Sequence, residues 1–515
     1  MIDPWLARRF TLLLSLTVLS LGLYEYFWTV TQLYGQLVID DAFITYRYAE
    51  NWASGLGPTW NLAEPPVEGY SNPFYMALLA LAKVLLGVDV PGFSRLVGMA
   101  SGLGTIAVLY LLVYRSTGSV RWGLVAAGVL AFNPHLAVWS VGGMETALYT
   151  LLITLSTLFV LKAREEDSRP RIWVGLGVIL ALTALTRTEG PVALGAFAVC
   201  VLLDTLSDSS KCRRLITQPL QTLRSSRWPG WALATIVGVC VVIALHLLLR
   251  HSYYGLWFPL PVYEKSELLR QKGLVVRFLQ NHWLFFSLWL PALCGLHSAS
   301  VRSALNHSLF LIVFLGLVVM NVDGVMTAYD RYMFPVLPLI VFGATLGIRE
   351  LLAVRFQYLI PALAFFGLVV VGQGERVIGA SRDYSVRNVM AYSTSVSRSH
   401  VTLGKWLGER IDDPMVRMVA SDCGVLPYYS RLRVIDFFGL NDRHIAMHGP
   451  DTDYIFDLRP ELIVVSPHGR DKPLREDIRL GRDYTLVGRW PGFYTLELYR
   501  RKDYQLPVDT VNKTP

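Results

Sequence analysis

Long apolar segments separated by short polar ones fill the first three quarters of the chain. A helix needs roughly 20 predominantly apolar residues to cross a bilayer, and eleven segments come close to this requirement. They cover residues 10–31, 94–114, 122–141, 146–161, 172–186, 190–206, 230–250, 283–297, 306–322, 333–348 and 356–373. The pattern predicts a polytopic α-helical membrane protein without internal repeats.

A further apolar segment, 73–88, decides the predicted topology. It is short and carries Lys83 in its middle. If it lies in the membrane interface, the basic loops 115–121 and 207–229 share one side of the membrane with Arg8. The positive-inside rule favours this arrangement. We therefore predict eleven spans in a cell (inner) membrane, with a cytoplasmic N-terminus and an extracytoplasmic C-terminus.

The pattern changes after residue 373, where shorter periodic segments replace the long apolar ones. "HVTLGKWLGERI" has helical spacing, and "VRMVAS", "RVIDFF", "ELIVVS" and "FYTLELYRR" have the alternation and composition of strands. The chain is therefore expected to consist of two units. Residues 1–373 form a transmembrane module with a long first outer loop (32–93), and residues 374–515 form an extracytoplasmic soluble domain of the α/β or α+β class.

Composition agrees with this division. Hydrophobic residues make up 53% of the chain and charged residues 17%, with a formal net charge of +8. Basic cytoplasmic loops account for such an excess, and the chain has no nucleic-acid-binding motif, so nucleic acid is not an expected partner. Of five cysteines only Cys423 lies in the predicted soluble domain. The sequence therefore predicts no disulfide framework and no metal site.

Acidic residues at the predicted outer face are the first candidates for chemistry. Asp40 and Asp41 follow the first span in "VIDDAFITYRYAENW". One of them fits the N-cap of a helix that ends at Gly55, but the second has no such role in a region where unpaired charge is costly. Glu145, in "WSVGGMETALYT", is either a helix-start acid or a second functional carboxylate. Such acids suit general base catalysis or cation binding.

Cationic residues lie at the same predicted face. Arg187 is followed by Glu189 in "LTRTEG", and a pair between these two is the simplest interpretation. Arg331 lies in "YDRYMFP", and arginine binds phosphate in a bidentate manner. The third outer loop adds His251, Lys265 and Arg270. These residues are candidates for binding a donor phosphate or substrate, although interfacial anchoring explains them equally well.

Ordered motifs connect these residues to a known family. "DDAFITYRYAENWASGLGPTWNLAEPPVEGYSNPFY", "NPHLAVWSVGGMETALY", "ALTRTEG", "YYGLWFPLPVYEK" and "YDRYMFPVLPL" occur in this order, followed by "ASDCGVLPYYSRLRVIDFFGLNDRHIA" in the tail. Together they resemble the GT-C superfamily of polyprenyl-phosphate-sugar-dependent glycosyltransferases. Within it they closely resemble the branch that contains the mycobacterial terminal arabinofuranosyltransferase. The resemblance extends from about residue 38 to 445.

The resemblance implies a membrane glycosyltransferase with a GT-C fold. It would move a sugar, arabinofuranose in that branch, from a polyprenyl phosphate in the membrane lipid to an extracytoplasmic glycan or lipid acceptor. A first-loop acid would be the catalytic base, which matches Asp40 and Asp41, and Glu145 would be a supporting acid. We assign the base to Asp40 and an orienting role to Asp41. No cofactor is required, and a divalent metal ion is left open.

Two other classes of function remain as alternatives. A secondary transporter would place its acids near the middle of the membrane on broken helices, with symmetry between repeats. A membrane assembly or scaffold protein would use its tail as a binding module. The depth of Asp40, Asp41 and Glu145 discriminates between transport and glycosyl transfer, because only a transferase needs them together under the outer loops.

Overall fold

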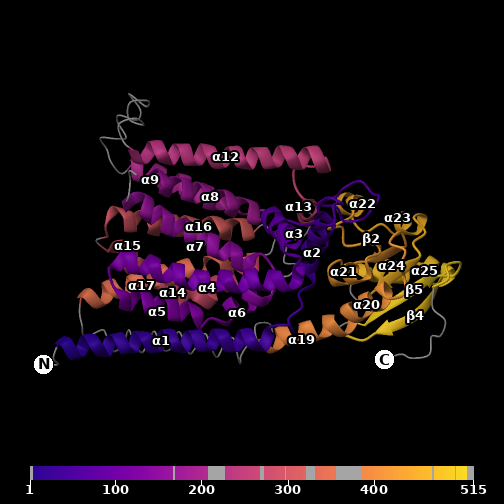
Figure 1. Ribbon diagram of the computed structural model, residues 1–515, viewed down its shortest axis with the longest axis horizontal. Coiled ribbons are helices and arrows are strands. Elements are labelled where there is room, and N and C mark those ends of the chain that lie inside the picture. Colours follow the sequence, from indigo (N-terminus) through magenta and orange to yellow (C-terminus); the bar gives the residue numbers. More distant parts are fainter. Residues whose placement is uncertain are drawn as a thin grey trace.

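The computed structural model describes residues 4–165, 169–206, 227–266, 272–295, 297–320, 331–354, 386–466, 469–492 and 495–506. It shows a bundle of long, roughly parallel helices that is joined at one end to a smaller domain containing a β-sheet (Figure 1). The predicted fold class, a helical membrane module with a soluble α/β or α+β domain, is confirmed. The predicted span 356–373 lies outside the described residues.

Six of the described helices are long and apolar enough to cross a membrane, and a bent pair adds a seventh candidate. The six spans lie in α1 (Pro4–Leu33), α4 (Val90–Thr117), α7 (Thr146–Glu165), α12 (Arg227–Tyr254), α16 (Ala299–Val319) and α17 (Leu337–Val354) with its preceding turn η2 (Phe334–Val336). The shorter bundle helices are α8 (Pro170–Thr186), α9 (Val192–Leu206), α14 (Lys272–Ser287) and α15 (Trp289–Cys294). The count of eleven spans stays a prediction.

Two predicted spans are interrupted. The segment 283–297 falls on the end of α14 and on α15, which are separated at Leu288. The segment predicted as a single helix over 122–141 forms α5 (Val120–Ala131) and α6 (Pro134–Val141), which meet at 64°. Pro134 has no N–H to continue the helix and keeps the preceding residue out of the helical region. The side chain of Asn133 then accepts a hydrogen bond from the N–H of His135 at 3.0 Å and caps the new helix. The predicted span is therefore bent, and the pair still counts as one candidate span.

The two ends of the bundle differ. Near the start of α1, Arg121 donates a hydrogen bond to Thr11 at 2.7 Å. Beyond the other end of α1, the first described helix of the tail, α19 (Val386–Val396), is attached through Ser393. This hydroxyl donates to the carbonyl of Gln36 at 2.5 Å and accepts from the N–H of Val38 at 2.7 Å. The start of α1 and the tail therefore lie at opposite ends of the bundle (Figure 1).

Helix α3 (Pro73–Leu86) does not run the length of the bundle. Near its start the hydroxyl of Tyr75 donates to the carbonyl of Gly143 at 2.9 Å. Near its end Lys83 lies 3.4 Å from Glu50 of α2 (Asp40–Ala53), a helix that packs against the tail. Both ends of α3 therefore lie at the tail end of the bundle, which agrees with the expectation that 73–88 does not cross.

The tail is built on a five-stranded mixed sheet with the order β2-β1-β3-β5-β4. Strands β2, β1 and β3 are parallel, whereas β5 pairs antiparallel with both β3 and β4. The strands are β1 (Arg417–Ala420), β2 (Arg433–Asp436), β3 (Leu462–Val465), β4 (Tyr484–Trp490) and β5 (Leu496–Arg501). The four strands predicted from the sequence are confirmed. Strand β4 was missed because it contains Gly488 and most of its side chains are not buried.

Short helices surround this sheet (Figure 1). After α19 they are the π-helix η5 (Ser397–Val401), α20 (Thr402–Gly408), α21 (Val425–Ser430), α22 (Arg443–His448), α23 (Thr452–Asp457), the 3-10 helix η6 (Gly469–Asp471), α24 (Lys472–Glu476) and α25 (Ile478–Asp483). Val419, Ile435 and Ile463 from the three parallel strands pack in one buried apolar cluster with residues of these helices. The tail therefore has an apolar core of its own.

A buried arginine joins the first outer loop to the tail. The guanidinium of Arg47, in α2, donates to the carbonyls of Pro427 and Leu432, both at 2.8 Å, and to that of Trp60 at 3.0 Å. A buried charge is tolerated when its hydrogen-bonding groups find such partners. These contacts fix the position of α2 and of the two acids at its start.

Candidate active site

A cavity of about 450 Å³ lies at the end of the bundle where the first outer loop meets the tail. Its charged residues stand at helix ends: Asp41 in the first turn of α2, Glu145 directly before α7 and Arg187 directly after α8. The other lining residues include Thr45, Gly69, Tyr70, Asn72, Met144, Glu189, Val192, Phe258, Pro261, Val262, Val318, Arg331, Tyr332 and Leu440. The cavity therefore combines charged groups with apolar side chains from the bundle, the loops and the tail.

Glu145 is the centre of the charge network. Its side chain is almost fully buried, and its Oε1 accepts a hydrogen bond from Arg187 at 2.8 Å and lies 3.5 Å from Arg331. Its Oε2 accepts from the amide of Asn72 at 2.8 Å. Burial opposes the charge, but the two guanidinium groups outweigh it and hold the pKa of Glu145 below its usual value. Glu145 is therefore an ionised anchor for both arginines.

Arg187 makes two carboxylate contacts where one was predicted. Its Nε lies 2.5 Å from Glu189, which confirms the predicted pair. Its contact with Glu145 was not predicted, because the two residues belong to different outer turns. Arg187 also faces the rings of Tyr149 and Tyr332. The guanidinium is thereby held rigidly at the cavity wall.

Asp41 is the accessible acid of the site. One of its carboxylate oxygens lies 3.1 Å from Nη1 of Arg331, and its side chain is 24% exposed, against 2% for Glu145. Among the described residues the buried Nε of Arg331 has no hydrogen-bond partner. An accessible carboxylate and a guanidinium group therefore stand together in the cavity wall.

Asp40 points to the tail instead of the cavity. Its two carboxylate oxygens accept hydrogen bonds from the backbone N–H groups of Gly424, at 3.0 Å, and Val425, at 2.8 Å. A Cβ atom at Gly424 would lie 1.8 Å from the carbonyl oxygen of Asp40, so only glycine permits this approach. Burial, and then repulsion by Asp422, raise the pKa of Asp40 to about 7.

The cap that the sequence suggested does not form. The helix starting at these acids exists, and Gly55 follows it with a φ of +82°. Its N-cap position is Ile39, and no side chain makes a cap hydrogen bond there. Asp40 and Asp41 are therefore both within the first turn, and the capping interpretation was wrong.

Of the remaining predicted phosphate ligands, the structure describes only the side chain of His251, which does not line the cavity. His251, at the end of α12, is exposed and stacks on Trp257 with a centroid separation of 4.2 Å. Lys265 belongs to α13 (Leu260–Ser266), but its side chain is not among those described, and Arg270 lies outside the described residues. Within the described part of the chain, no group of three or more His, Cys, Asp or Glu side chains could hold a metal ion.

Sequence reasoning missed polar residues of the first loop. Asn72 connects Thr45, which donates to its Oδ1 at 3.2 Å, to Glu145. Glu68, also missed, is buried against Arg250 at 2.7 Å, and burial raises the pKa of Glu68 to about 7. A signal for Asn72 was available, because "SNPFY" places a polar residue directly before a proline-led helix. No local signal pointed to Glu68.

This architecture is the GT-C fold of membrane glycosyltransferases. The chain is similar to ArnT from Cupriavidus metallidurans bound to undecaprenyl phosphate, with a TM-score of 0.59 and 16% identity over 94% of this chain and 97% of that one. It is also similar to the archaeal oligosaccharyltransferase AglB from Archaeoglobus fulgidus in complex with an inhibitory peptide and a dolichol-phosphate. That match has a TM-score of 0.52 and 11% identity over 96% of this chain and 75% of that one.

Sequence comparison adds a partial family match. Residues 70–223 match the dolichyl-phosphate-mannose-protein mannosyltransferase family, and residues 387–507 match a domain of unknown function. No curated protein matches the chain. The fold and the family match together indicate a membrane glycosyltransferase of the GT-C type, which confirms the predicted class. The mycobacterial branch is not among these matches and stays a prediction.

Proposed function

We propose that the protein transfers a sugar from a polyprenyl-phosphate donor to a hydroxyl group of an extracytoplasmic glycan or lipid. The observation that carries this proposal is the cavity itself, in which the accessible Asp41 stands beside two arginines anchored by the buried Glu145. The lipid phosphates bound to ArnT and AglB support a donor of this class. The position of the acids at helix ends favours transfer over transport.

Arg331 and Arg187 would bind the donor phosphate. Guanidinium groups match the geometry of phosphate oxygens and keep their charge under all relevant conditions. Both guanidinium groups line the cavity, Arg331 beside Asp41 and Arg187 beside Glu189. The apolar side of the cavity, including Val192 and Val318, would receive the first part of the polyprenyl chain. Lys265 and Arg270 stay predictions for the same role.

Asp41 would be the catalytic base. The acceptor oxygen forms a bond to the anomeric carbon while the bond from that carbon to the phosphate oxygen breaks. The acceptor proton passes to the carboxylate of Asp41, and polyprenyl phosphate leaves with the electron pair. The transition state resembles an oxocarbenium ion, which a nearby carboxylate also stabilises. Our sequence-based assignment named Asp40 as base, but the direction of the two side chains supports the reverse.

The sugar is proposed from two resemblances. The sequence motifs resemble an arabinofuranosyltransferase branch, so arabinofuranose is the first donor sugar to test. The family match over residues 70–223 adds mannose as the second. With arabinofuranose as the donor sugar, the acceptor to test is a cell-wall glycan. With mannose, the acceptor to test is a protein or lipid hydroxyl group.

The test is a turnover assay on the purified full-length protein. A panel of polyprenyl-phosphate sugars is supplied with acceptors, with and without a chelator of divalent cations, and release of polyprenyl phosphate is followed. We expect one donor sugar to be turned over. Asp41→Asn should then lower the rate by about a hundred- to ten-thousand-fold, because general base catalysis typically contributes that much.

Glu50→Gln is the matched control, because Glu50 lies on the same helix and pairs with Lys83 outside the cavity. It should keep the wild-type rate. Turnover of Asp41→Asn within a few-fold of wild type would remove Asp41 from the mechanism. Absence of turnover with every donor would overturn the proposed function.

A further inference from the structure

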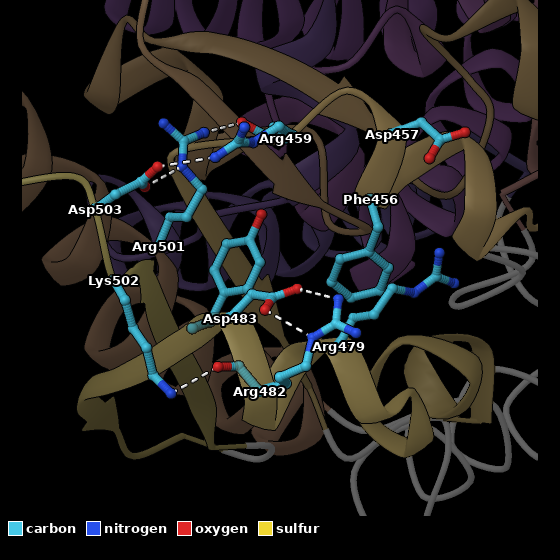
Figure 2. A pocket seen from close by; sticks show the side chains of 10 residues that line it. Phe456, Asp457, Arg459, Arg479, Arg482, Asp483, Arg501, Lys502 and Asp503 are labelled. Atoms are coloured by element: carbon cyan, nitrogen blue, oxygen red, sulfur yellow. Dashed lines mark hydrogen bonds and ion pairs between the residues drawn. The ribbon is translucent and has the colours of Figure 1, made fainter.

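A second cavity, which we call the tail cavity, lies on the soluble domain and has a volume of about 520 Å³. It opens between α23, α25 and the end of β5, at the side of the tail that faces away from the helical bundle (Figure 1). Its lining residues are Phe456, Asp457, Arg459, Arg479, Arg482, Asp483, Tyr484, Arg501, Lys502 and Asp503 (Figure 2). The glycosyl transfer proposed above uses none of them.

The arginine side chains of the tail cavity are already paired with acids, two of which, Asp477 and Glu461, stand behind the lining. Each arginine of the wall forms an ion pair with a carboxylate, as Figure 2 shows for several of them. The pairs include Arg459–Asp503 at 2.9 Å, Arg479–Asp477 at 2.7 Å, Arg482–Asp483 at 2.7 Å and Arg501–Glu461 at 3.0 Å. Lys502 donates to the carbonyl of Arg482 at 2.6 Å. The wall is therefore dense in hydrogen-bonding groups but close to neutral.

Such a wall selects for a neutral ligand rich in hydroxyl groups. A phosphate or carboxylate would have to compete with the acids that already hold each arginine. A hydroxyl both donates and accepts hydrogen bonds, so it can bond a guanidinium N–H and the neighbouring carboxylate oxygen together without separating the pair. The rings of Phe456 and Tyr484, 5.9 Å apart at the base, give the cavity a rigid apolar floor.

We propose that the tail cavity binds a neutral saccharide segment of the acceptor. This inference rests on the proposed function and names a second contact of the same substrate. Because the tail cavity and the cavity of Asp41 lie on different sides of the tail, one acceptor that reaches both must be an extended chain. The tail cavity would therefore raise the affinity for long acceptors and leave the reaction of short ones unchanged.

The experiment compares two double variants of the full-length protein. Arg482→Ala with Asp483→Ala removes an exposed ion pair from the tail cavity without leaving an unpaired charge. Arg489→Ala with Glu497→Ala removes a pair of similar geometry that lies outside it. Binding of linear arabinofuranose and mannose oligosaccharides is measured by saturation-transfer NMR, with inorganic phosphate as competitor. KM and kcat are measured with long and short acceptors.

We expect the first variant to lose about tenfold in oligosaccharide affinity, since each lost hydrogen bond changes binding by roughly that factor. KM should rise by the same factor for the long acceptor only, and the control variant should match wild type. Equal binding by both variants, no binding by wild type, or displacement by phosphate would overturn the proposal. Turnover of a short acceptor that still depends on Asp41 would show that the proposed function survives such a failure.

Discussion

Asp40 and Asp41 are neighbours in sequence with different surroundings. Successive residues of an α-helix point about 100° apart, so α2 directs Asp41 to Arg331 and Asp40 to the tail. The carboxylate of Asp40 binds two backbone N–H groups, which holds α21 against α2. We therefore regard Asp40 as a positioning residue that acts on the reaction through the placement of Asp41.

Asp40→Asn should weaken this attachment. The amide of asparagine has only one acceptor oxygen, so one of the N–H groups of Gly424 and Val425 would lose its partner. Native Asp40 keeps its proton up to about pH 7, whereas an ordinary aspartate releases it near pH 3.8. Between pH 3.8 and about pH 7 the native state therefore binds more protons than the unfolded state. Asp40 thus makes the free energy of unfolding fall as pH rises. Asp40→Asn should flatten that fall in melting temperature.

Two measurements, the pH dependence of the melting temperature and kcat, distinguish a positioning role of Asp40 from base catalysis. The pKa of Glu68 is also raised, so Glu68 contributes to the same fall of stability with rising pH. The contribution of Asp40 is therefore the difference between the melting profiles of wild type and Asp40→Asn. Gly424→Ala should lower kcat in the same way as Asp40→Asn, because its Cβ atom would separate the same contact. If Asp40→Asn were as inactive as Asp41→Asn, with an unchanged melting profile and a fully active Gly424→Ala, Asp40 would be the base after all.

At the level of the elements, α13 contributes to the cavity wall from the third outer loop. It lines the cavity through Pro261 and Val262. At its start the N–H of Leu260 donates to the carbonyl of Glu68 at 2.9 Å, and near its end Glu264 accepts from Arg470 of the tail at 2.7 Å. The helix is thus held by the first loop and the tail together, which makes the cavity wall depend on three distant parts of the chain.

Arg470→Met should loosen α13. The substitution leaves the carboxylate of Glu264, which is 4% exposed, without this partner, and breaking a buried pair on one side costs about 3–5 kcal/mol. We expect a raised KM for the donor with a smaller change in kcat. Adding Glu264→Gln should restore part of the affinity, because it removes the buried negative charge that has lost Arg470.

Arg489→Met is the control for this prediction, because its pair with Glu497 is exposed on one side and such surface pairs contribute only about 0–1 kcal/mol. Steady-state kinetics across the donor concentration would show the effect. An unchanged KM in Arg470→Met, together with normal folding, would mean that α13 does not depend on this contact.

At the level of the whole molecule, the bundle has two chemically different ends. Arg121 lies beside the start of α1, whereas the cavity, the first outer loop and the tail share the other end. The positive-inside rule then assigns the end with the start of α1 to the cytoplasm. The orientation of the protein in the membrane is a prediction. It can be tested by labelling one position at each end of the bundle.

Cysteine labelling in intact cells tests the orientation. In a variant without native cysteines, Val120→Cys and Ile478→Cys place thiols at exposed positions, since these residues are 44% and 80% exposed. We expect an impermeant reagent to label position 478 in intact cells and position 120 only after permeabilisation. Labelling of position 120 in intact cells would contradict both the orientation and the eleven-span topology.

Local patterns were enough to predict much of this molecule. Apolar length identified most of the bundle helices, and alternation identified four of the five strands. The position of polar residues between spans placed Asp41, Glu145, Arg187 and Arg331 at one face, and these four line one cavity. These features depend on properties that each segment carries within itself, namely its length, its period and its charge. The pair of Arg187 and Glu189 was predictable for the same reason, because the two residues are adjacent in one turn.

Other features depend on contacts between segments far apart in the sequence. Arg331 meets Asp41 across 290 residues, and Asp40 meets Gly424 across 384. Whether an acid at the start of α2 faces the cavity or the tail depends on how α2 is rotated, and that rotation is fixed by Arg47 against Pro427 and Leu432. No local pattern contains the rotation of a helix about its axis. Which of the two adjacent acids faces the cavity therefore became visible only once the tail was packed against the first loop.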